Sequence, residues 1–469
     1  MRLLTLGAFL LYAVYSLSRF PQFLPAGYDL GIFDQAVRQY SHFQPPYVAL
    51  KGIRYNLLGD HFHPIIAVLA PLYWLWDDPR VLPIAQAGLV AASIPIVHAV
   101  LGDRFERSTR LLLLVGYSFA WPVQTMIDFD FHEIAFAVPL LAGVILALER
   151  RRDAPLVVCC LVLLGVREDM GAVVALVGLI RLLRAPRRWL GAALGAAGAV
   201  AFVVVTTVIV PHFNAHGSFA YWTFRELGPD APSAAAFIVT HPLRTVELLF
   251  VPVVKLSTWA WLFLPLLLLP FASRYTLLAL PLLAERFLSS RPHLWTPQFH
   301  YSAPIWVILF CAAIDALRHV PPQRRRLGAK ILAITLAGTV LLGLVLSPTN
   351  HPLGRLIYPA WRRTPHIEAQ QQAVEAIPPD TCVAVDDRLA PRLTKSNRTT
   401  LPGVAQPPPD YVILDLTHAE VSYQMGTPQS HEAVYLRAGY LPIGGEDGLV
   451  ILRRPGTISA RPACAPTAP

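Results

Sequence analysis

The sequence predicts an all-α polytopic membrane protein of about eleven transmembrane helices, followed by a small C-terminal α/β domain. Two observations predict the membrane part. Of the 469 residues, 54% are hydrophobic and only 15% are charged, and the mean hydropathy is +0.48. The apolar residues also gather into runs such as 256–271 and 331–346, which need lipid around them. A third observation predicts the C-terminal domain, because residues 348–469 are polar and rich in proline.

Eleven apolar runs divide residues 1–347 into the predicted membrane helices. The first run, 3–17, is followed by no small-residue cleavage site, so we interpret it as an uncleaved span and not as a signal peptide. The runs 155–166 and 171–183 are shorter than the ~20 residues of a straight span, which predicts a short or partly re-entrant hairpin. The other runs are 81–101, 111–127, 134–148, 190–210, 256–272, 275–288, 301–317 and 329–346.

The first loop, residues 21–80, is the longest loop between the predicted spans. Its apolar stretch 64–76 is short and bounded by proline, which predicts a helix at the membrane surface rather than a further span.

The distribution of Arg and Lys gives the predicted orientation. With a cytoplasmic N-terminus, the Arg-rich loops 102–110, 150–153, 184–188 and 318–326 fall on the cytoplasmic side, as the positive-inside rule demands. The formal charge of +9 therefore reflects topology, and its dispersal over separate loops excludes a nucleic-acid partner. An odd number of spans places the C-terminal domain outside the cytoplasm.

That domain is expected to contain strands at 381–385, 411–416 and 449–452, a helix near 367–377 and a frayed tail at 461–469. A disulfide between Cys382 and Cys464 is compatible with an extracytoplasmic location, and the sequence leaves it open.

Ionisable residues near membrane depth are costly and often functional. Here they gather in the loops assigned to the outer side. They are Asp29 and Asp34 in the first loop, Asp128, Asp130, His132 and Glu133 in the second, Glu168 and Asp169 at the hairpin tip, and Glu285, Arg286, Arg291, His300 and Tyr301 near a later loop.

Several of these residues have simpler interpretations. Asp29 is as consistent with capping the helix that follows it as with catalysis. Arg167 and Arg286 are expected to pair with the acids beside them in sequence. The aromatic stretch 219–224 is more typical of an interfacial belt than of a sugar platform. His61 and His63, with His132 and Glu133, offer ligands for a divalent metal ion, which is the one cofactor we consider.

Acids, arginines and histidines on one face suit transfer of a sugar from a lipid-linked donor. A carboxylate removes the proton of the acceptor, and cationic groups hold the charge of the leaving phosphate. We assign the base to Asp29 or Asp34. The other predicted roles are positioning of acceptor or metal by Asp128, Asp130, His132 and Glu133, binding of donor phosphate by Arg286, Arg291, His300 and Tyr301, and support by Glu168, Asp169 and Glu285. The alternatives are a transporter or flippase for a lipid-linked or anionic solute, and a non-catalytic scaffold.

The motifs YDLGIFDQ (28–35), HFHP (61–64), DFHE (130–133), RED (167–169) and ERFLSS (285–290) with HY (300–301) carry a family resemblance. In this order they resemble a bacterial family of multi-spanning membrane proteins grouped with the GT-C glycosyltransferases. The resemblance implies a GT-C fold in the bacterial cytoplasmic (inner) membrane, a polyprenyl-phosphate sugar donor, and a glycan, lipid or protein acceptor. It favours Asp29 over Asp34 as the first-loop acid. The Asp-Glu pair of the protein mannosyltransferases and lipid A aminoarabinose transferases is missing from the first loop.

Overall fold

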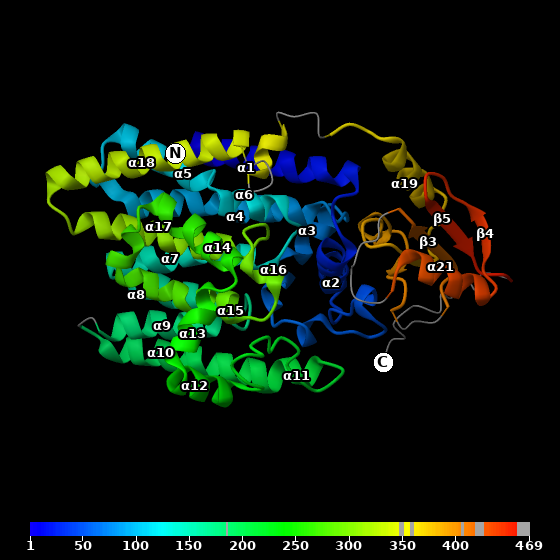
Figure 1. The fold of residues 1–469 in the computed structure, drawn as a ribbon, viewed down its shortest axis with the longest axis horizontal. Coiled ribbons are helices and arrows are strands. Elements are labelled where there is room, and N and C mark those ends of the chain that lie inside the picture. Colours follow the sequence, from blue (N-terminus) through cyan, green and yellow to red (C-terminus); the bar gives the residue numbers. More distant parts are fainter. Residues whose placement is uncertain (184–185, 347–350, 357–360, 405–407, 418–425, 457–469) are drawn as a thin grey trace.

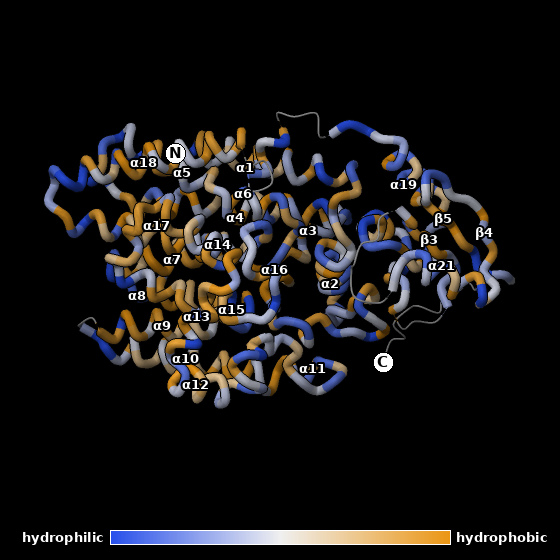
Figure 2. The backbone as a smooth tube through the Cα atoms, in the orientation of Figure 1, coloured by the Kyte–Doolittle hydropathy of each residue, from blue (hydrophilic) through white to orange (hydrophobic). Residues whose placement is uncertain are grey.

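The chain forms a bundle of helices with a small sheet at one end (Figure 1). The structure, a computed structural model, describes residues 1–183, 186–346, 351–356, 361–404, 408–417 and 426–456. Apolar residues follow the helices of the bundle, while polar ones collect at its ends and around the sheet (Figure 2). This arrangement confirms the predicted class, a helical membrane protein with a small C-terminal sheet.

Five helical segments in the described ranges are long and apolar enough to cross a membrane, and a bent pair of helices would make a sixth. Each of the five overlaps one predicted run. They contain α1 (Arg2–Arg19), α4 (Val81–Leu101), α5 and α6 (Arg107–Ser118 and Trp121–Asp128), α10 and α11 (Arg188–Val204 and Val210–Phe213), and α18 (Pro322–Leu346).

Five further predicted runs form shorter helices, so the count of eleven crossings stays a prediction. Within this group α8 and α9 form the short hairpin expected from the sequence, and every residue of α17 from Ser302 to Leu317 is buried. These helices are α7 (Ala137–Arg150), α8 (Asp153–Leu163), α9 (Met170–Leu182), α15 (Leu280–Leu288) and α17 (Ser302–Arg318).

The predicted single span 256–272 is wrong, because the chain breaks there. Helix α14 ends at Phe263 and is followed by two 3-10 turns, Leu264–Leu266 and Leu269–Ala272, that begin at or next to prolines. Proline lacks an N–H and clashes with the preceding turn, so it interrupts a helix. Two helices that the sequence did not predict precede α14 (Val253–Phe263), namely α12 (Ala231–Thr240) and α13 (Pro242–Phe250).

The first loop is folded. A π-helical turn, Gly27–Gly31, leads into α2 (Ile32–Ser41). The predicted surface helix is confirmed as a 3-10 segment, Pro64–Leu69, continued by α3 (Ala70–Leu75). Together these elements lie between the bundle and the sheet (Figure 1).

The C-terminal module, by which we mean the described residues from 361 to 456, carries a five-stranded sheet in the order β2-β1-β3-β5-β4. Strand β1 is parallel to its neighbours β2 and β3, whereas β5 is antiparallel to β3 and β4. The three predicted strands and the predicted helix are present, and β2 and β4 are additional. Cys464 and the tail 461–469 lie outside the described residues. The elements are β1 (Cys382–Val385), β2 (Arg398–Thr400), β3 (Tyr411–Asp415), β4 (Leu441–Gly444), β5 (Leu449–Arg453), α19 (Pro365–Glu375), α20 (Ala390–Leu393) and α21 (Pro428–Arg437).

The module is attached directly to the first loop. The N–H of Gly27 donates to the backbone oxygen of Asp387 over 2.7 Å, and Gln35 Nε2 donates to Thr399 O over 2.9 Å. Arg392 donates to Phe20 O over 2.6 Å and lies over the Phe20 ring. One continuous hydrophobic core contains residues of both parts. The module therefore has a fixed position against the loop that carries the predicted base.

Candidate active site

Asp29 lies in the π-helical turn and faces His132 of the loop 128–133. His132 Nε2 is 3.6 Å from Asp29 Oδ1. The other ring nitrogen, Nδ1, is 3.1 Å from the backbone oxygen of Asp130. Because a carbonyl oxygen only accepts, Nδ1 carries the hydrogen and the lone pair of the neutral ring points from Nε2 toward Asp29. The Asp29 side chain is 28% exposed, and that of Asp130 only 5%.

Burial changes the protonation of both partners. Burial, followed by the carboxylates of Asp130 and Asp387, raises the pKa of Asp29 well above its usual value. Burial lowers the pKa of His132 to about 3. The imidazole is therefore neutral at physiological pH, and Asp29 is a stronger base than an ordinary aspartate.

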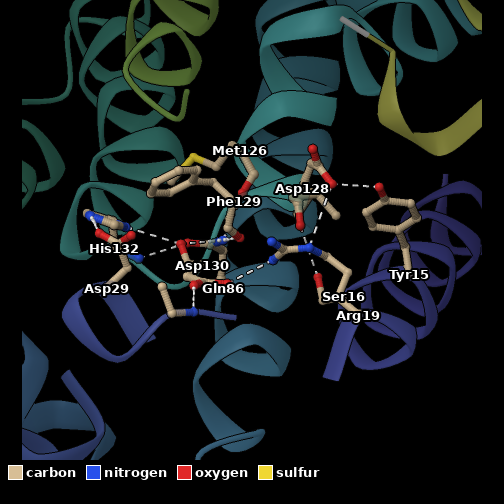
Figure 3. Close-up of polar contacts among 12 residues, drawn as sticks. Tyr15, Ser16, Arg19, Asp29, Gln86, Met126, Asp128, Phe129, Asp130 and His132 are labelled. Atoms are coloured by element: carbon tan, nitrogen blue, oxygen red, sulfur yellow. Dashed lines mark hydrogen bonds and ion pairs between the residues drawn. The ribbon is translucent and has the colours of Figure 1, made fainter. Parts of the chain in front are cut away.

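Asp128 and Asp130 are held by Arg19 of α1, whose guanidinium lies between them (Figure 3). Arg19 Nη1 donates to Asp130 Oδ1 over 2.8 Å, and the N–H of Ala26 donates to the other oxygen over 2.6 Å. Asp128 accepts from Tyr15 Oη over 2.6 Å. These two acids tie the second loop to α1 and to the turn before Asp29, which favours a positioning role.

Asp34, the second predicted base, is completely buried. Arg38 Nη1 and Nη2 donate to its two oxygens over 2.6 and 3.1 Å, and Tyr73 Oη donates to Oδ1 over 2.8 Å. A carboxylate whose two oxygens both accept hydrogen bonds, and which has no access to solvent, is typical of a structural ion pair. The geometry favours Asp29 as the base.

The two histidines of the HFHP motif have different environments. Burial alone would lower the pKa of His61, but the Glu168 carboxylate, which accepts from Nδ1 over 2.6 Å, raises it to about 9. His63 is buried, and burial lowers its pKa to about 4. Within the described ranges, no group of three or more His, Cys, Asp or Glu side chains is arranged to hold a metal ion. The divalent metal ion stays a prediction, and we derive no step through one.

Arg167 collects three of the predicted acids. Its guanidinium lies 2.5 Å from Asp169 Oδ2, 3.4 Å from Glu285 Oε2 and 3.8 Å from Glu133 Oε1. The pairing of Arg167 with Asp169 agrees with the simpler interpretation, whereas Glu285 pairs with Arg167 and not with Arg286. One buried cation thus joins the second loop, the hairpin tip and α15.

The predicted phosphate-binding residues separate into two groups. Arg286 is buried and donates to Ser302 Oγ and, over 2.5 Å, to Thr296 O, so it joins α15 to the start of α17. His300 is buried with its ring stacked 3.8 Å from that of His132, and the Tyr301 ring is 4.2 Å from His300. Arg291 lies over the Tyr221 ring and borders a large cavity. Arg291 is the member of the four that meets this open space.

The cavity, of about 840 Å³, lies between loops of the helical bundle and the C-terminal module. It is bordered by Tyr28, which precedes Asp29 in the chain. It is also bordered by Lys51 and Asp387, whose charges act on the Asp29 carboxyl group. A space of this size holds a small ligand or the polar part of a larger one. Its further lining residues include Trp222, Arg225, Arg291, His293, Asp386, Leu401, Pro402, Val404 and His431.

Sequence reasoning missed the contribution of the module to this region. Asp386 and Asp387 directly follow the predicted strand at 381–385, and residues at this position in α/β sheets often have a function, which is the sequence signal that points to them. Lys51 gave no local signal, because only the fold brings it to Asp60, where Nζ donates to Oδ2 over 2.5 Å.

The fold resembles that of a protein of known structure, ArnT. A crystal structure of ArnT from Cupriavidus metallidurans bound to undecaprenyl phosphate matches with a TM-score of 0.51 and 13% sequence identity, over 95% of this chain and 98% of that chain. The structure of the same protein in the apo state has a TM-score of 0.49 and 12% identity, over 95% and 97%. At such low identity the likeness to the first of these structures shows the fold alone, which is ArnT-like.

No curated protein matches the sequence. The sequence profile described as "Predicted membrane protein (DUF2079)" matches residues 19–451, which is nearly the whole chain. The chain therefore belongs to the DUF2079 family of membrane proteins.

Proposed function

We propose that this protein is an inverting GT-C-type glycosyltransferase. It moves a sugar from a polyprenyl-phosphate donor to an acceptor at the outer face of the cytoplasmic membrane. The observation that carries the proposal is the Asp29–His132 pair. It presents a partly exposed carboxylate of raised pKa beside a large cavity, on a GT-C fold.

The chemistry requires one base. Asp29 accepts the proton of an acceptor hydroxyl while the hydroxyl oxygen attacks the anomeric carbon of the sugar. The bond between that carbon and the phosphate oxygen breaks, and polyprenyl phosphate leaves with the electron pair. Once Asp29 is protonated, its O–H can donate to the lone pair of His132 Nε2, whose tautomer is held by the backbone of Asp130.

Arg291 is the proposed phosphate ligand. It borders the cavity, whereas Arg286 is occupied by internal hydrogen bonds. A guanidinium stabilises the charge that grows on a leaving phosphate. The ArnT structure bound to undecaprenyl phosphate supports a donor of this lipid class, since the two folds are alike.

The proposed orientation follows from three helices that begin at the site. Helices α4, α7 and α17 run from the outer loops to an opposite end, where Arg104, Arg150 and Arg318 border a second cavity. The 17 residues of α17 span about 25 Å at the helical rise. Positive charge at that end supports a cytoplasmic assignment for it and an outer-face assignment for the site.

Deletion and complementation test the function. A strain without the gene should lack a sugar modification of its envelope glycans or lipids and accumulate lipid-linked sugar. The wild-type gene should restore the profile. Asp29→Asn should not, while Asp77→Asn, an exposed acid in the same loop, should do so at equal membrane abundance. Unchanged glycans in the deletion strain, or full complementation by Asp29→Asn, would contradict the proposal. Restoration of solute movement without sugar transfer would instead support the transport alternative.

A further inference from the structure

The topology of the C-terminal module creates a crevice at one edge of its sheet. Strand β1 has a parallel neighbour on each side, and the chain passes from β1 to β2 on one side and then to β3 on the other. In open α/β sheets, ligands bind at the carboxyl ends of strands where the connections diverge in this way. Asp386 and Asp387 follow β1, and Asp415 ends β3, so three acids lie at this point.

The large cavity lies over this same edge. On the module side it is bordered by residues that follow β1 and β2 and by residues at the start of α21, such as Asp386, Leu401 and His431. On the bundle side it is bordered by Tyr28, Trp222 and other residues of the outer loops. The crevice of the module therefore opens toward the first loop, at Tyr28, Leu50 and Lys51.

Asp386 has one oxygen available to a ligand. Its Oδ2 accepts from the N–H of Asp415, and no hydrogen bond to Oδ1 is found among the described residues. A carboxylate oxygen that faces a cavity can accept from a hydroxyl group. The neighbouring Asp387 uses Oδ1 to accept from the N–H of Tyr28 over 2.8 Å, so it holds the first loop in place.

Trp222 offers an apolar ring on the opposite wall. Its Nε1 donates to Gly228 O over 2.7 Å, so the indole N–H is already satisfied and the ring itself is what meets the cavity. An aromatic ring packs well against the C–H groups of a sugar ring, while carboxylates bind the hydroxyl groups at its rim. The sequence suggests that the aromatic stretch 219–224 is an interfacial belt. Because Trp222 also borders the cavity, its ring is placed to contact a ligand there.

We infer that this cavity is the acceptor site and that the acceptor is a carbohydrate, whose hydroxyl groups donate to Asp386 and whose ring packs against Trp222. That the bound carbohydrate is the acceptor rests on the proposed function. That the cavity binds a carbohydrate does not depend on it. Tyr28, which borders the cavity and donates its N–H to Asp387, directly precedes Asp29 in the chain.

Binding of saccharides tests the inference without any turnover. Full-length protein in nanodiscs would be applied to a printed glycan array that contains bacterial and mammalian saccharides. Wild type should bind a defined group of saccharides. Trp222→Ala and Asp386→Ala should weaken binding at least tenfold. Asp386→Asn should also weaken it, while an oxygen remains to accept from Asp415 and preserve the fold.

Matched controls separate this site from general effects. Trp189→Ala and Glu375→Ala change an exposed tryptophan and an exposed acid away from the cavity and should bind as wild type. Asp29→Asn should also retain binding, so a failure of the catalytic proposal leaves this result intact. The inference is overturned if no saccharide binds, or if the Trp222 and Asp386 variants bind like wild type while unfolding at the same temperature.

Discussion

Asp29 and Asp34 lie in consecutive turns of the first loop, but their neighbours give them different properties. Asp34 meets the guanidinium of Arg38 and the hydroxyl of Tyr73, and it has no exposed surface. Asp29 meets two other carboxylates and a neutral imidazole, and it remains partly exposed. The first environment holds Asp34 in a buried ion pair, and the second raises the pKa of Asp29 so that it takes up a proton more readily.

The raised pKa of Asp29 predicts a shifted pH profile. The base acts when it is deprotonated, so kcat/KM should fall as the pH drops through the pKa of Asp29, at a higher pH than for an ordinary aspartate near 3.9. Asp387→Asn removes a neighbouring negative charge but keeps an oxygen to accept from Tyr28. It should lower the pKa of Asp29 and move this limb to lower pH. An unchanged profile in the variant would argue against electrostatic coupling between Asp387 and Asp29.

A structural role for Asp34 predicts a loss of stability. Asp34→Asn leaves Arg38 without its buried partner, and breaking such a pair costs about 3–5 kcal/mol. The thermal unfolding temperature in detergent should fall markedly, whereas Asp77→Asn, which loses only an exposed contact with Arg38, should change it little. A variant Asp34→Asn that unfolds like wild type but is inactive would return the base assignment to Asp34.

At the scale of elements, α9 and α10 pack through glycines. A Cβ added at Gly178 would lie 2.1 Å from Gly195 N, and one added at Gly191 would lie 2.2 Å from Leu182 N. Small residues let two membrane helices approach closely enough for backbone contact. The hairpin formed by α8 and α9 is short, so this contact fixes α9 and the residues Arg167 to Asp169 before it.

This packing predicts a strong effect of a small substitution. Gly178→Val should push the two helices apart and lower the unfolding temperature, since overpacking costs about 1–3 kcal/mol. Gly338→Val in α18 is the control, because a Cβ there meets nothing within 4 Å. Equal unfolding temperatures for the two variants would show that the close approach does not contribute to stability.

At the scale of the whole molecule, the bundle and the module meet at the first loop. Arg392 contacts Phe20 and Phe23 from the module side, and the N–H groups of Gly27 and Tyr28 donate to Asp387. The position of Asp29 thus depends on both parts of the chain.

This dependence predicts a local change in hydrogen exchange. Arg392→Ala should speed amide exchange in the segment that contains Gly27 and Tyr28, because the docking contacts that protect these amides become weaker. Arg437→Ala, an exposed arginine at the end of α21, should leave exchange there unchanged. Equal protection in the two variants would mean that Arg392 does not hold the module.

The predictable part of the fold and site has a clear physical origin. Long apolar runs and alternating strands carry local signals, so most helices, three strands and the cluster of outer-loop residues were recognised in the sequence. Asp34 remained the second candidate for the base, because the Arg38 and Tyr73 contacts that occupy it arise only in the fold. Pro265 and Pro270 are a local signal for the breaks after Phe263. The cavity wall to which Asp386 contributes depends instead on packing between distant segments, which no local pattern contains.

The most direct test measures release of polyprenyl phosphate by the purified protein. Wild-type protein in proteoliposomes would be supplied with lipid extract that contains polyprenyl-phosphate sugars and with envelope glycans as acceptors. It should release polyprenyl phosphate and form an equal amount of glycosylated acceptor, and Asp29→Asn should reduce the rate by about 10²–10⁴-fold. Release by Asp29→Asn at the wild-type rate would contradict the account.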